Sequence, residues 1–330
     1  MSLLKEFAEK VASMVDGYIY ASVKGKPVQL YEAALHLIRA GGKRLRPLMV
    51  VASAQMLEQP IEKALPFAVA VELLHNFTLI HDDIMDRDEY RRGVPTVHKI
   101  WGENIAITAG DLLYSKAFEA LSDALDRGVE PENVALAARV LAKATSTIAE
   151  GQALDLLFED RDDVSLEEYL DMIYRKTAAL FEASVVLGGL VATTDQTILS
   201  RLADYGRNLG IAFQIRDDIL GLVGDEKTLG KPVYSDIREG KKTILVIYAL
   251  ERLEDSEREE LLSILGAKTA DKKELERAAD LIKKTGAVEY AERLARDYAE
   301  RARQALLTFP ESTARKVLEE LIDYVVVREK

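Results

Sequence analysis

Apolar residues recur at intervals of three and four positions along nearly the whole chain. One example, with charged residues between its members, is Tyr290, Leu294, Tyr298 and Leu306. That period belongs to α-helices, and no alternating strand bounded by hairpin turn dipeptides stands out. The breaks between periodic stretches are short, and all eight prolines lie in or beside them or at expected helix starts. The pattern predicts one all-α domain over residues 1–330, a bundle of about a dozen helices.

Two of these stretches, Glu72–Asp86 and Thr177–Val191, are apolar around most of the helix circumference. Helices of that kind are usually buried among other helices. Aspartates at the end of such a helix would then point into the bundle. The pattern therefore indicates an interior polar site.

Composition narrows the class of protein. The chain has 330 residues, 48% of them hydrophobic, no cysteine and a formal charge of −12. Length alone allows two domains, but no low-complexity linker divides the chain. The negative charge argues against a nucleic-acid partner, and the absence of cysteine excludes disulfides and thiolate metal sites.

Location follows from the apolar runs. The start, MSLLKEFAEK, carries acids unlike a secretory signal, and the longest apolar run, Ala183 to Thr193, is too short to span a bilayer. We therefore expect a cytoplasmic protein without a membrane span.

The first acidic motif lies at the end of an apolar helix. Asp82 and Asp86 are four positions apart and so stack on one face, with Asp83 beside them. Like charges at this spacing repel, and Mg²⁺, which prefers carboxylates and water, removes the repulsion. A solvated helix end is the alternative for a single DxxxD pattern.

The second acidic motif repeats the first 135 positions later. Asp217 and Asp218 follow the apolar positions of FQI, and Asp225 and Glu226 come next. Helical bundles build metal sites from inward-facing carboxylates on opposed helices. Two such pairs therefore favour a metal site over a solvated surface, with the pairs facing each other across one cavity.

Basic residues follow each acidic motif, and a third group lies behind two glycines. These cations are Lys43, Arg44 and Arg46 in AGGKRLRP, then Arg91 and Arg92, then Lys231, Lys241 and Lys242. Glycines allow close backbone approach, and Arg and Lys bind phosphate oxygens. Cations beside acidic metal sites indicate a metal–diphosphate ligand, and no P-loop motif offers another route to phosphate. A charged turn before a helix is the alternative for AGGKRLRP.

Four polar residues sit among helical apolar ones. His75 lies two turns before Asp82, and His81 directly precedes it, where it can cap the helix or pair with a neighbouring acid. Taken alone, His75, Thr177 and Gln214 are packing residues with internal hydrogen bonds.

Seven motifs in order give the chain a family resemblance. They are GGKRLRP, HDDIMDRDEYRRGVPT, GDLLYSKAF, EGQALD, YRKTAALF, FQIRDDILG and GKPVYSDIREGKKT. The chain resembles the trans-isoprenyl diphosphate synthases, and among them the archaeal short-chain geranylgeranyl diphosphate synthases. The resemblance implies mostly antiparallel helices around a deep central cavity, in a homodimer or a higher homo-oligomer.

The resemblance also implies a reaction. Isopentenyl diphosphate attacks the cation formed when an allylic diphosphate (dimethylallyl, geranyl or farnesyl) ionises, and a proton is lost. In such enzymes Mg²⁺ ions, usually three, bridge the allylic diphosphate to the aspartates. The implied metal ligands are Asp82, Asp83, Asp86, Asp217 and Asp218.

Other roles carry over residue by residue. Arg91, Lys176 and Lys231 would hold the allylic diphosphate, and Thr177 and Gln214 would face the developing cation. The residues expected to hold isopentenyl diphosphate are Lys43, Arg46, His75 and Arg92, and Lys241 is a further candidate for binding substrate.

Two positions depart from the family pattern. Gly221 occupies the fifth position of the second motif, where many relatives have aspartate, and Asp225 is placed to compensate in part. Tyr234 stands where glycine is frequent in the lysine-rich loop.

Product length in this family depends on bulk beneath the first aspartate motif. Phe77 lies five residues before Asp82, about 7–8 Å down the axis. Thr78 is small where one type of farnesyl-making relative has a second aromatic, and Leu74 lies one turn deeper. We expect mainly the C20 product with some C15, unless Phe77 is ordinary core packing.

Four other functions remain open. They are a farnesyl diphosphate synthase, a class I terpene cyclase, a head-to-head synthase and a non-catalytic synthase subunit. The intact GGKRLRP disfavours the cyclase and the head-to-head synthase, and both aspartate pairs disfavour the subunit.

Overall fold

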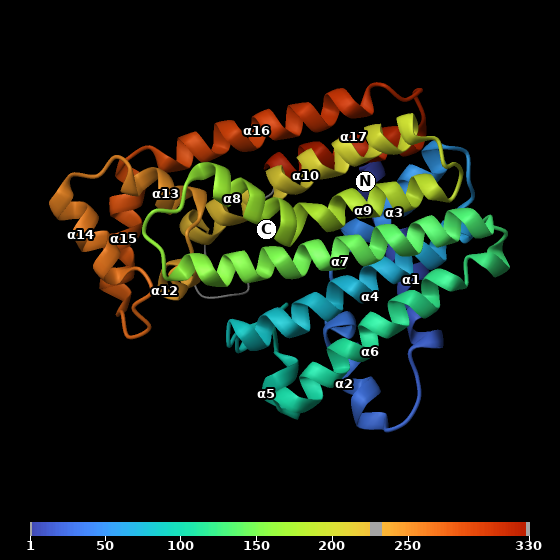
Figure 1. The fold of residues 1–330 in the computed structure, drawn as a ribbon, viewed down its shortest axis with the longest axis horizontal. Helices are drawn as coiled ribbons and strands as arrows, with labels where there is room; N and C mark the ends of the chain where they lie inside the picture. The colour runs from blue at the N-terminus through green and yellow to red at the C-terminus, as the bar shows by residue number, and fades with distance from the viewer. Residues whose placement is uncertain (1, 225–232, 328–330) are drawn as a thin grey trace. The chain divides into compact units, whose positions relative to one another are not determined.

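The computed structural model describes residues 2–224 and 233–327, and these are almost entirely helical (Figure 1). The helices are α1 (Leu3–Ser22), α2 (Val28–Arg39), α3 (Leu45–Met56), α4 (Ile61–Met85), α5 (Val97–Trp101), α6 (Glu103–Ser122), α7 (Pro131–Glu159), α8 (Leu166–Ile173), α9 (Ala179–Leu190), α10 (Gln196–Val223), α12 (Ser235–Glu239), α13 (Ile244–Leu250), α14 (Asp255–Ile264), α15 (Lys272–Lys284), α16 (Ala287–Leu306) and α17 (Thr313–Val327), with a 3-10 turn at Leu125–Arg127 and a π-helical turn at Tyr174–Ala178. The prediction of an all-α fold is confirmed.

Several helix starts follow directly from their capping residues. Ser2 accepts a hydrogen bond from the Lys5 amide at the start of α1. Ser165 and Glu168 form a reciprocal capping box at α8, and Asp271 and Glu274 form another at α15. Each box satisfies two backbone donors that the first turn leaves free.

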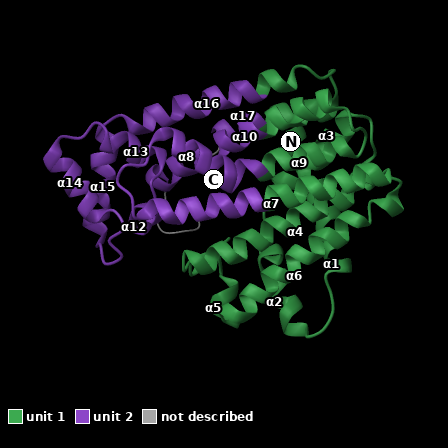
Figure 2. Cartoon of the chain, viewed as in Figure 1, with its two compact units in different colours: residues 1–145, 180–206, 303–321 green, residues 146–179, 207–302, 322–330 purple. Residues whose placement is uncertain are grey.

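The chain forms two compact units (Figure 2). Unit 1 comprises residues 1–145, 180–206 and 303–321, and unit 2 comprises residues 146–179, 207–302 and 322–330. Helices α7, α9, α10, α16 and α17 have residues in both units. The assignment of residues 1–330 to one domain stays a prediction.

Helix α4 forms the core of unit 1. Phe67, Leu73 and Leu74 on this helix are fully buried, and α4 packs against α3 and α6. His81 contacts Ile107 of α6. Phe77 lies one turn before His81 on α4, and it contacts Tyr114, which lies about two turns after Ile107 on α6. Helices α4 and α6 are therefore antiparallel.

The length and apolar composition of α4 would also suit a membrane span. Within the described parts of the chain no other helix meets that test, and 72% of the apolar stretch is buried against neighbouring helices. Such burial is typical of a core helix of a folded domain.

A glycine sets the distance between α3 and α9 in unit 1. A Cβ at Gly188 would collide with the Val50 carbonyl oxygen and lie 2.7 Å from the Ser53 Cβ. Because the obstacle includes backbone, neither helix can repack around a larger residue. Glycine is thus required for this close approach.

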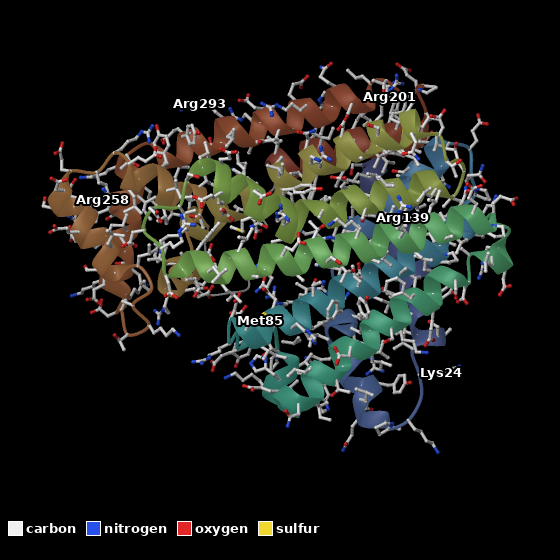
Figure 3. The ribbon with its side chains drawn as sticks, viewed as in Figure 1. Lys24, Met85, Arg139, Arg201, Arg258 and Arg293 are labelled. Carbon is white, nitrogen blue, oxygen red and sulfur yellow. The ribbon has the colours of Figure 1, made fainter. Side chains whose placement is uncertain are left out.

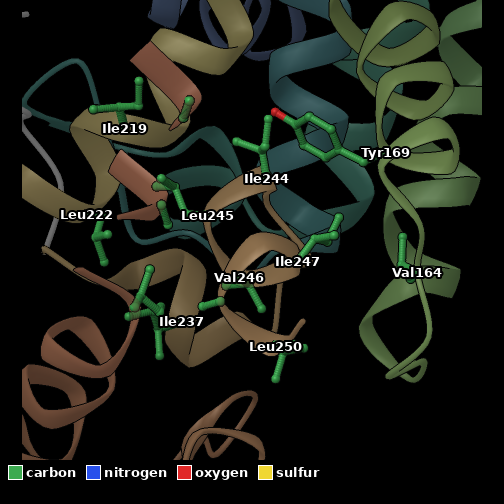
Figure 4. Packing of buried hydrophobic residues seen from close by; sticks show 14 of the residues in the cluster. Val164, Tyr169, Ile219, Leu222, Ile237, Ile244, Leu245, Val246, Ile247 and Leu250 are labelled. Atoms are coloured by element: carbon green, nitrogen blue, oxygen red, sulfur yellow. The ribbon is translucent and has the colours of Figure 1, made fainter. Parts of the chain in front are cut away.

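Unit 2 has its own hydrophobic core (Figure 4). Six of the seven residues of helix α13 belong to this core. Ile219 and Leu222 of α10 and Ile237 of α12 pack into the same cluster. Tyr169 of α8 is fully buried there, although it carries a hydroxyl. That hydroxyl needs a hydrogen-bond partner.

A small hairpin was not predicted. Strands β1 (Tyr90–Arg91) and β2 (Val94–Pro95) pair antiparallel, and Arg92 and Gly93 between them have φ angles of 54° and 76°. These values are those of a tight primed turn, which usually contains Asn or Asp before Gly. Two-residue strands show no alternation, and arginine is an unusual turn residue, so the sequence carried no hairpin signal.

We expect Gly188→Ala to lower the free energy of unfolding by about 1–3 kcal/mol because the added methyl group meets backbone. Gly17→Ala is the matched control. Nothing lies within 4 Å of a Cβ at that exposed helical position, so alanine should stabilise by about 0.5–1 kcal/mol. Chemical denaturation measures both, and equal effects at the two positions would contradict the packing argument.

Candidate active site

The first acidic group lies at the C-terminal end of α4, where Met85 is labelled in Figure 3. The Asp86 amide donates to the Asp82 carbonyl at 2.9 Å, so the helical spacing continues through Asp86. Asp83 is fully buried, whereas Asp82 and Asp86 are partly exposed. The stacking expected from the sequence therefore holds, with one carboxylate turned inward.

Arg91 lies among these carboxylates. Its guanidinium donates to Asp83 and lies 3.5 Å from Asp82 and 3.3 Å from Asp88. Burial nevertheless raises the pKa of Asp83 to about 7, although the Arg91 charge opposes this shift. The other Asp83 oxygen, Oδ2, is buried and has no hydrogen-bond partner within residues 2–224 and 233–327. An unpaired buried acceptor of this kind suits a cation.

The cationic side chains of the GGKRLRP loop point in different directions. Lys43 is exposed at the start of α3. Arg44 has a left-handed backbone and points inward, where it bonds to Asp16 at 2.8 Å and to Glu72 at 3.2 Å. The interpretation of Arg44 as a phosphate ligand is wrong, because its side chain is only 2% exposed and each of its three guanidinium nitrogens already donates inside the protein.

Arg46 and His75 meet between α3 and α4. The Arg46 guanidinium lies 3.3 Å from His75 Nε2 and 4.6 Å from the Phe181 ring centroid. Because a guanidinium can only donate, Nε2 must accept, and the proton of a neutral imidazole sits on Nδ1. Burial and the Arg46 charge lower the pKa of His75 well below its usual value, so the ring is neutral.

Arg46 also retains an unused donor. Burial lowers the pKa of Arg46 to about 10, and its Nε is buried without an acceptor within the described parts of the chain. A desolvated guanidinium with a free donor is suited to an anion.

Arg92 joins the hairpin to the GGKRLRP loop. It donates to the carbonyl oxygens of Leu37 and Gly41, and its contact with Asn76 Oδ1 measures 3.4 Å. Asn76 in turn donates to Glu72 at 2.9 Å. The turn conformation thus sends Arg91 and Arg92 to different partners.

Sequence reasoning missed Glu72 and Asn76. Glu72 is only 2% exposed and links Arg44 to Asn76, which holds Arg92. A signal was available, since both are polar positions on an otherwise apolar helix.

The residues expected to set product length lie on the same helix. Phe77 is half-buried and forms edge-to-face contacts with His81 and Tyr114 at 4.8 and 5.5 Å between ring centroids. Thr78 donates to the His75 carbonyl at 2.8 Å, and Leu74 is fully buried.

His81 does not pair with an acid next to it in sequence. Its Nε2 lies 3.0 Å from the Ile107 carbonyl oxygen of α6 and 4.0 Å from Asp111. A Cβ at Gly110 would collide with the imidazole. Glycine at position 110 therefore lets His81 pack against α6 and support the Phe77 ring.

In unit 2 the π-helical turn presents Lys176. Its ammonium bonds to Asp155 of α7 at 2.6 Å, and Asp155 is buried. A Cβ at Gly151 would collide with the Lys176 amide nitrogen. Within the EGQALD motif, Gly151 leaves space for the π-helical turn and Asp155 pairs with Lys176. The pairing of Asp155 with Lys176 was not predicted from the sequence.

Thr177, Gln214 and Asp218 form one hydrogen-bonded chain. Thr177 donates to the Gln214 carbonyl and the Gln214 amide donates to Asp218, each at 2.8 Å. Tyr169 donates to the other Asp218 oxygen at 2.7 Å. Burial is the main cause that raises the pKa of Asp218 to about 7, whereas Asp217 is exposed.

The two departures from the family pattern have structural counterparts. A Cβ at Gly221 would lie 2.7 Å from an Asp236 carboxylate oxygen, so Asp236 occupies the space beside the glycine. Tyr234 has a φ of 66°, the left-handed conformation that favours glycine.

The lysines of the last motif also diverge. Lys241 is paired with Glu239 at 2.8 Å. Lys242 is buried and donates to the carbonyl oxygens of Glu159 and Gly240. Its interpretation as a diphosphate ligand is wrong, because the residue is only 5% exposed and its ammonium is directed at two backbone carbonyl oxygens inside the fold. Lys231 and Asp225 lie outside the described residues.

The donor sets fit a divalent cation and an anion. Carboxylate oxygens, including the unpaired Asp83 Oδ2, are ligands that Mg²⁺ prefers. Among the described residues no three acidic or histidine side chains gather closely enough to hold a metal without a further ligand. The first aspartate group belongs to unit 1 and the second to unit 2, and their convergence on one site stays a prediction.

Comparison with known proteins gives a consistent picture. The family model described as polyprenyl synthetase matches residues 27–282. The chain is similar to the geranylgeranyl diphosphate synthase of Saccharolobus solfataricus, 48% identical over 99% of this chain and 98% of that one. It is also similar to the geranylfarnesyl diphosphate synthase of Aeropyrum pernix, 46% identical over 96% and 100% of the two chains.

A solved structure extends the likeness to the fold. The polyprenyl synthase of Caulobacter crescentus CB15, complexed with calcium and isoprenyl diphosphate, superposes with a TM-score of 0.91. The two sequences are 37% identical, and the match covers 99% of this chain and 98% of that one.

Asp83 should make the stability of the metal-free protein depend on pH. Its folded pKa of about 7 lies above the ordinary 3.8, so between pH 4 and 7 the folded state retains a proton that the unfolded state has lost. We expect the unfolding free energy of the wild type to fall by about 1–3 kcal/mol across this window relative to Asp83→Asn, and to level above it. Denaturation in EDTA measures this, with the exposed Asp126→Asn as control. Parallel curves for the wild type and Asp83→Asn would contradict a buried, protonated Asp83.

Proposed function

Because this chain belongs to the polyprenyl synthetase family, we propose that it condenses isopentenyl diphosphate with dimethylallyl, geranyl and farnesyl diphosphates. Its main product is geranylgeranyl diphosphate, with some farnesyl diphosphate. The observation that carries this proposal is that, in unit 1, adjacent arginines of the hairpin contact both candidate sites: Arg91 bonds to Asp83 at the end of α4, and Arg92 donates to the Gly41 carbonyl of the loop in which Arg46 keeps a buried Nε without an acceptor among the described residues. Such a pair of sites suits two diphosphates and a divalent cation.

Magnesium is the proposed cofactor, with three ions per active site. The residues that would hold it are Asp82, Asp83 and Asp86 of the first motif and Asp217 and Asp218 of the second. When bound, Mg²⁺ offsets the charge that develops on the leaving diphosphate. The calcium and isoprenyl diphosphate of the Caulobacter structure support a divalent cation beside a diphosphate.

The cations divide between the two substrates. Arg91, Lys176 and Lys231 bind the allylic diphosphate, and Lys43, Arg46, His75 and Arg92 bind isopentenyl diphosphate, with Lys241 as a further substrate ligand. Arg91 and Lys176 already neutralise buried carboxylates, so each is fixed in place before substrate arrives. Preplaced charge of this kind accelerates departure of an anionic leaving group.

Condensation then needs no protein nucleophile. The allylic C1–O bond breaks, the double bond of isopentenyl diphosphate attacks C1, and loss of a proton restores a double bond. Thr177 and Gln214 face the allylic cation with neutral oxygens, which stabilise it without trapping it. Apolar walls exclude water from the cation.

Assembly and location follow the family. We propose one polyprenyl synthetase domain over residues 1–330, a homodimer with larger assemblies left open, and a place in the cytoplasm. Retention of both aspartate pairs supports a catalytic chain over a non-catalytic subunit. The relative from Aeropyrum is named for a longer product, so product length has to be measured directly.

Labelled isopentenyl diphosphate and farnesyl diphosphate, incubated with the protein and Mg²⁺, should give a C20 alcohol after dephosphorylation. EDTA should abolish it, and Asp82→Asn should lower kcat by about 10²-fold or more because charge stabilisation is lost. Asp126→Asn, an exposed carboxylate outside the site, should be unaffected.

The chromatogram also separates the alternatives. A C15 product from a dimethylallyl starter, without C20, would make this a farnesyl diphosphate synthase. A folded protein that elongates no starter would contradict the proposed function.

Phe77→Ala should shift the product from C20 toward longer chains because the half-buried ring is removed from beneath the aspartates. Chromatography of the products with farnesyl diphosphate as starter measures the change. Thr78→Ala is the adjacent control: it keeps position 78 small, which is the property expected to matter for product length, and removes only a hydroxyl bonded to the His75 carbonyl, so it should keep the wild-type spectrum. An active Phe77→Ala with unchanged products would eliminate Phe77 as the floor.

A further inference from the structure

The Arg46 guanidinium is desolvated, yet no carboxylate of the described residues forms an ion pair with it. Within residues 2–224 and 233–327 its polar and aromatic partners are His75 Nε2, 3.3 Å from Nη1, and the Phe181 ring, whose centroid lies 4.6 Å from Cζ. Burial lowers the pKa of Arg46 only to about 10, so the group is charged at neutral pH. A buried cation needs compensation from its surroundings. Both direct partners of Arg46 are neutral.

An aromatic ring can compensate a cation without neutralising it. The face of the ring attracts positive charge because its quadrupole is negative there. Phe181 lies on α9 and is fully buried, so this attraction acts away from water, where it is strongest. A ring has no net charge that an incoming anion would have to displace. Arg44, in contrast, is paired with Asp16 and Glu72.

The same two partners determine how the Arg46 guanidinium is turned. Nη1 is directed at His75 and Cζ lies over the Phe181 ring. Because the guanidinium is planar, these two contacts also set the direction of its Nε–H donor. That donor is buried and has no acceptor in the part of the chain that the structure describes. The arrangement therefore combines an unneutralised charge with a fixed, unused donor.

Helix packing in unit 1 holds the ring in place. Val50 lies one turn after Arg46 on α3, and Gly188 lies two turns after Phe181 on α9. The close approach of Gly188 to the Val50 carbonyl oxygen thus sets the distance between the two helices near the ring and the guanidinium. A Cβ at Gly206 of α10 would lie 2.8 Å from the Phe181 carbonyl oxygen, so α9 is also supported from its other neighbour.

We propose that Phe181 is a positioning residue for isopentenyl diphosphate binding. Its ring holds the Arg46 guanidinium charged and oriented toward the diphosphate, and the ring itself does not touch the substrate. The inference rests on the proposed function, in which Arg46 binds isopentenyl diphosphate. In the sequence Phe181 is one apolar residue of an apolar helix, so nothing there separates it from ordinary core packing.

Binding in the absence of metal tests the proposal without catalysis. Isopentenyl diphosphate is titrated into the protein in EDTA by calorimetry, because carboxylates without a divalent cation repel the anion and only the cationic site is measured. Phe181→Leu should raise the Kd about tenfold or more because the ring face is lost. The matched control is Phe67→Leu, at a fully buried ring of α4 over which no cation lies within the described residues. It should change the Kd by less than about twofold.

Fluorination separates the attraction of the ring for a cation from its packing. Fluorinated phenylalanines incorporated at position 181 nearly keep the size of the ring and weaken the negative charge of its face. The Kd for isopentenyl diphosphate in EDTA should therefore rise with each added fluorine. A Kd independent of fluorination would overturn the proposal. Because the shape of the ring is conserved, this series decides the question if Phe181→Leu fails to fold.

Steady-state kinetics show which substrate is affected. With farnesyl diphosphate as the second substrate, Phe181→Leu should raise the KM for isopentenyl diphosphate about tenfold. The value of kcat and the KM for farnesyl diphosphate should stay unchanged, because the ring acts only on the binding of one diphosphate. An unchanged KM for isopentenyl diphosphate, or a lower kcat at unchanged KM, would contradict the role of Phe181.

Failure of the proposed function gives a different result. A wild type that elongates no starter, but binds isopentenyl diphosphate in EDTA with a Kd that depends on fluorination, would overturn that function and leave the role of Phe181 intact. An active wild type whose Kd is the same with and without the ring would overturn the role of Phe181 alone. Absence of binding in EDTA would also overturn it, because Arg46 would then not bind the anion without metal.

Discussion

Burial of carboxylates at the ends of apolar helices is the constraint on which the rest of this structure depends. An ionised carboxylate away from water is costly unless it is paired and hydrogen-bonded. Asp83 is paired with Arg91, Asp155 with Lys176, and Asp218 with two hydrogen-bond donors. Much of the local architecture, including the hairpin and the π-helical turn, brings those partners into place.

The buried arginines of unit 1 are subject to the same requirement: a buried cation also needs a charge or hydrogen-bond partner. Arg44 is buried against Asp16 and Glu72, and that ion network holds the loop from which Lys43 and Arg46 extend. Arg46, in contrast, keeps a buried donor without an acceptor among the described residues. Within this motif Arg44 therefore supports the loop, whereas Arg46 keeps a donor for an anion.

Helical periodicity and motif spacing predicted the fold class and the stacking of Asp82 and Asp86. Which way Arg44 and Lys242 point was beyond reach, because a left-handed residue before α3 and the end of α7 decide it. The bond between Tyr169 and Asp218 joins positions 49 residues apart, and no local pattern encodes it. The space beside Gly221 is filled by Asp236 from a different helix, so the missing aspartate could be noticed in the sequence but its neighbour could not.

The glycines differ in what their neighbours can change. At Gly188 the obstacle includes the Val50 carbonyl, which every residue type shares, so no substitution at position 50 makes room for a side chain at 188. At Gly110 the obstacle is the His81 imidazole, a side chain that a smaller residue can replace. Positions 81 and 110 can therefore vary together among homologous chains, whereas position 188 has no partner that could compensate. Gly110 can therefore change together with residue 81, whereas Gly188 is required by the packing of α3 against α9.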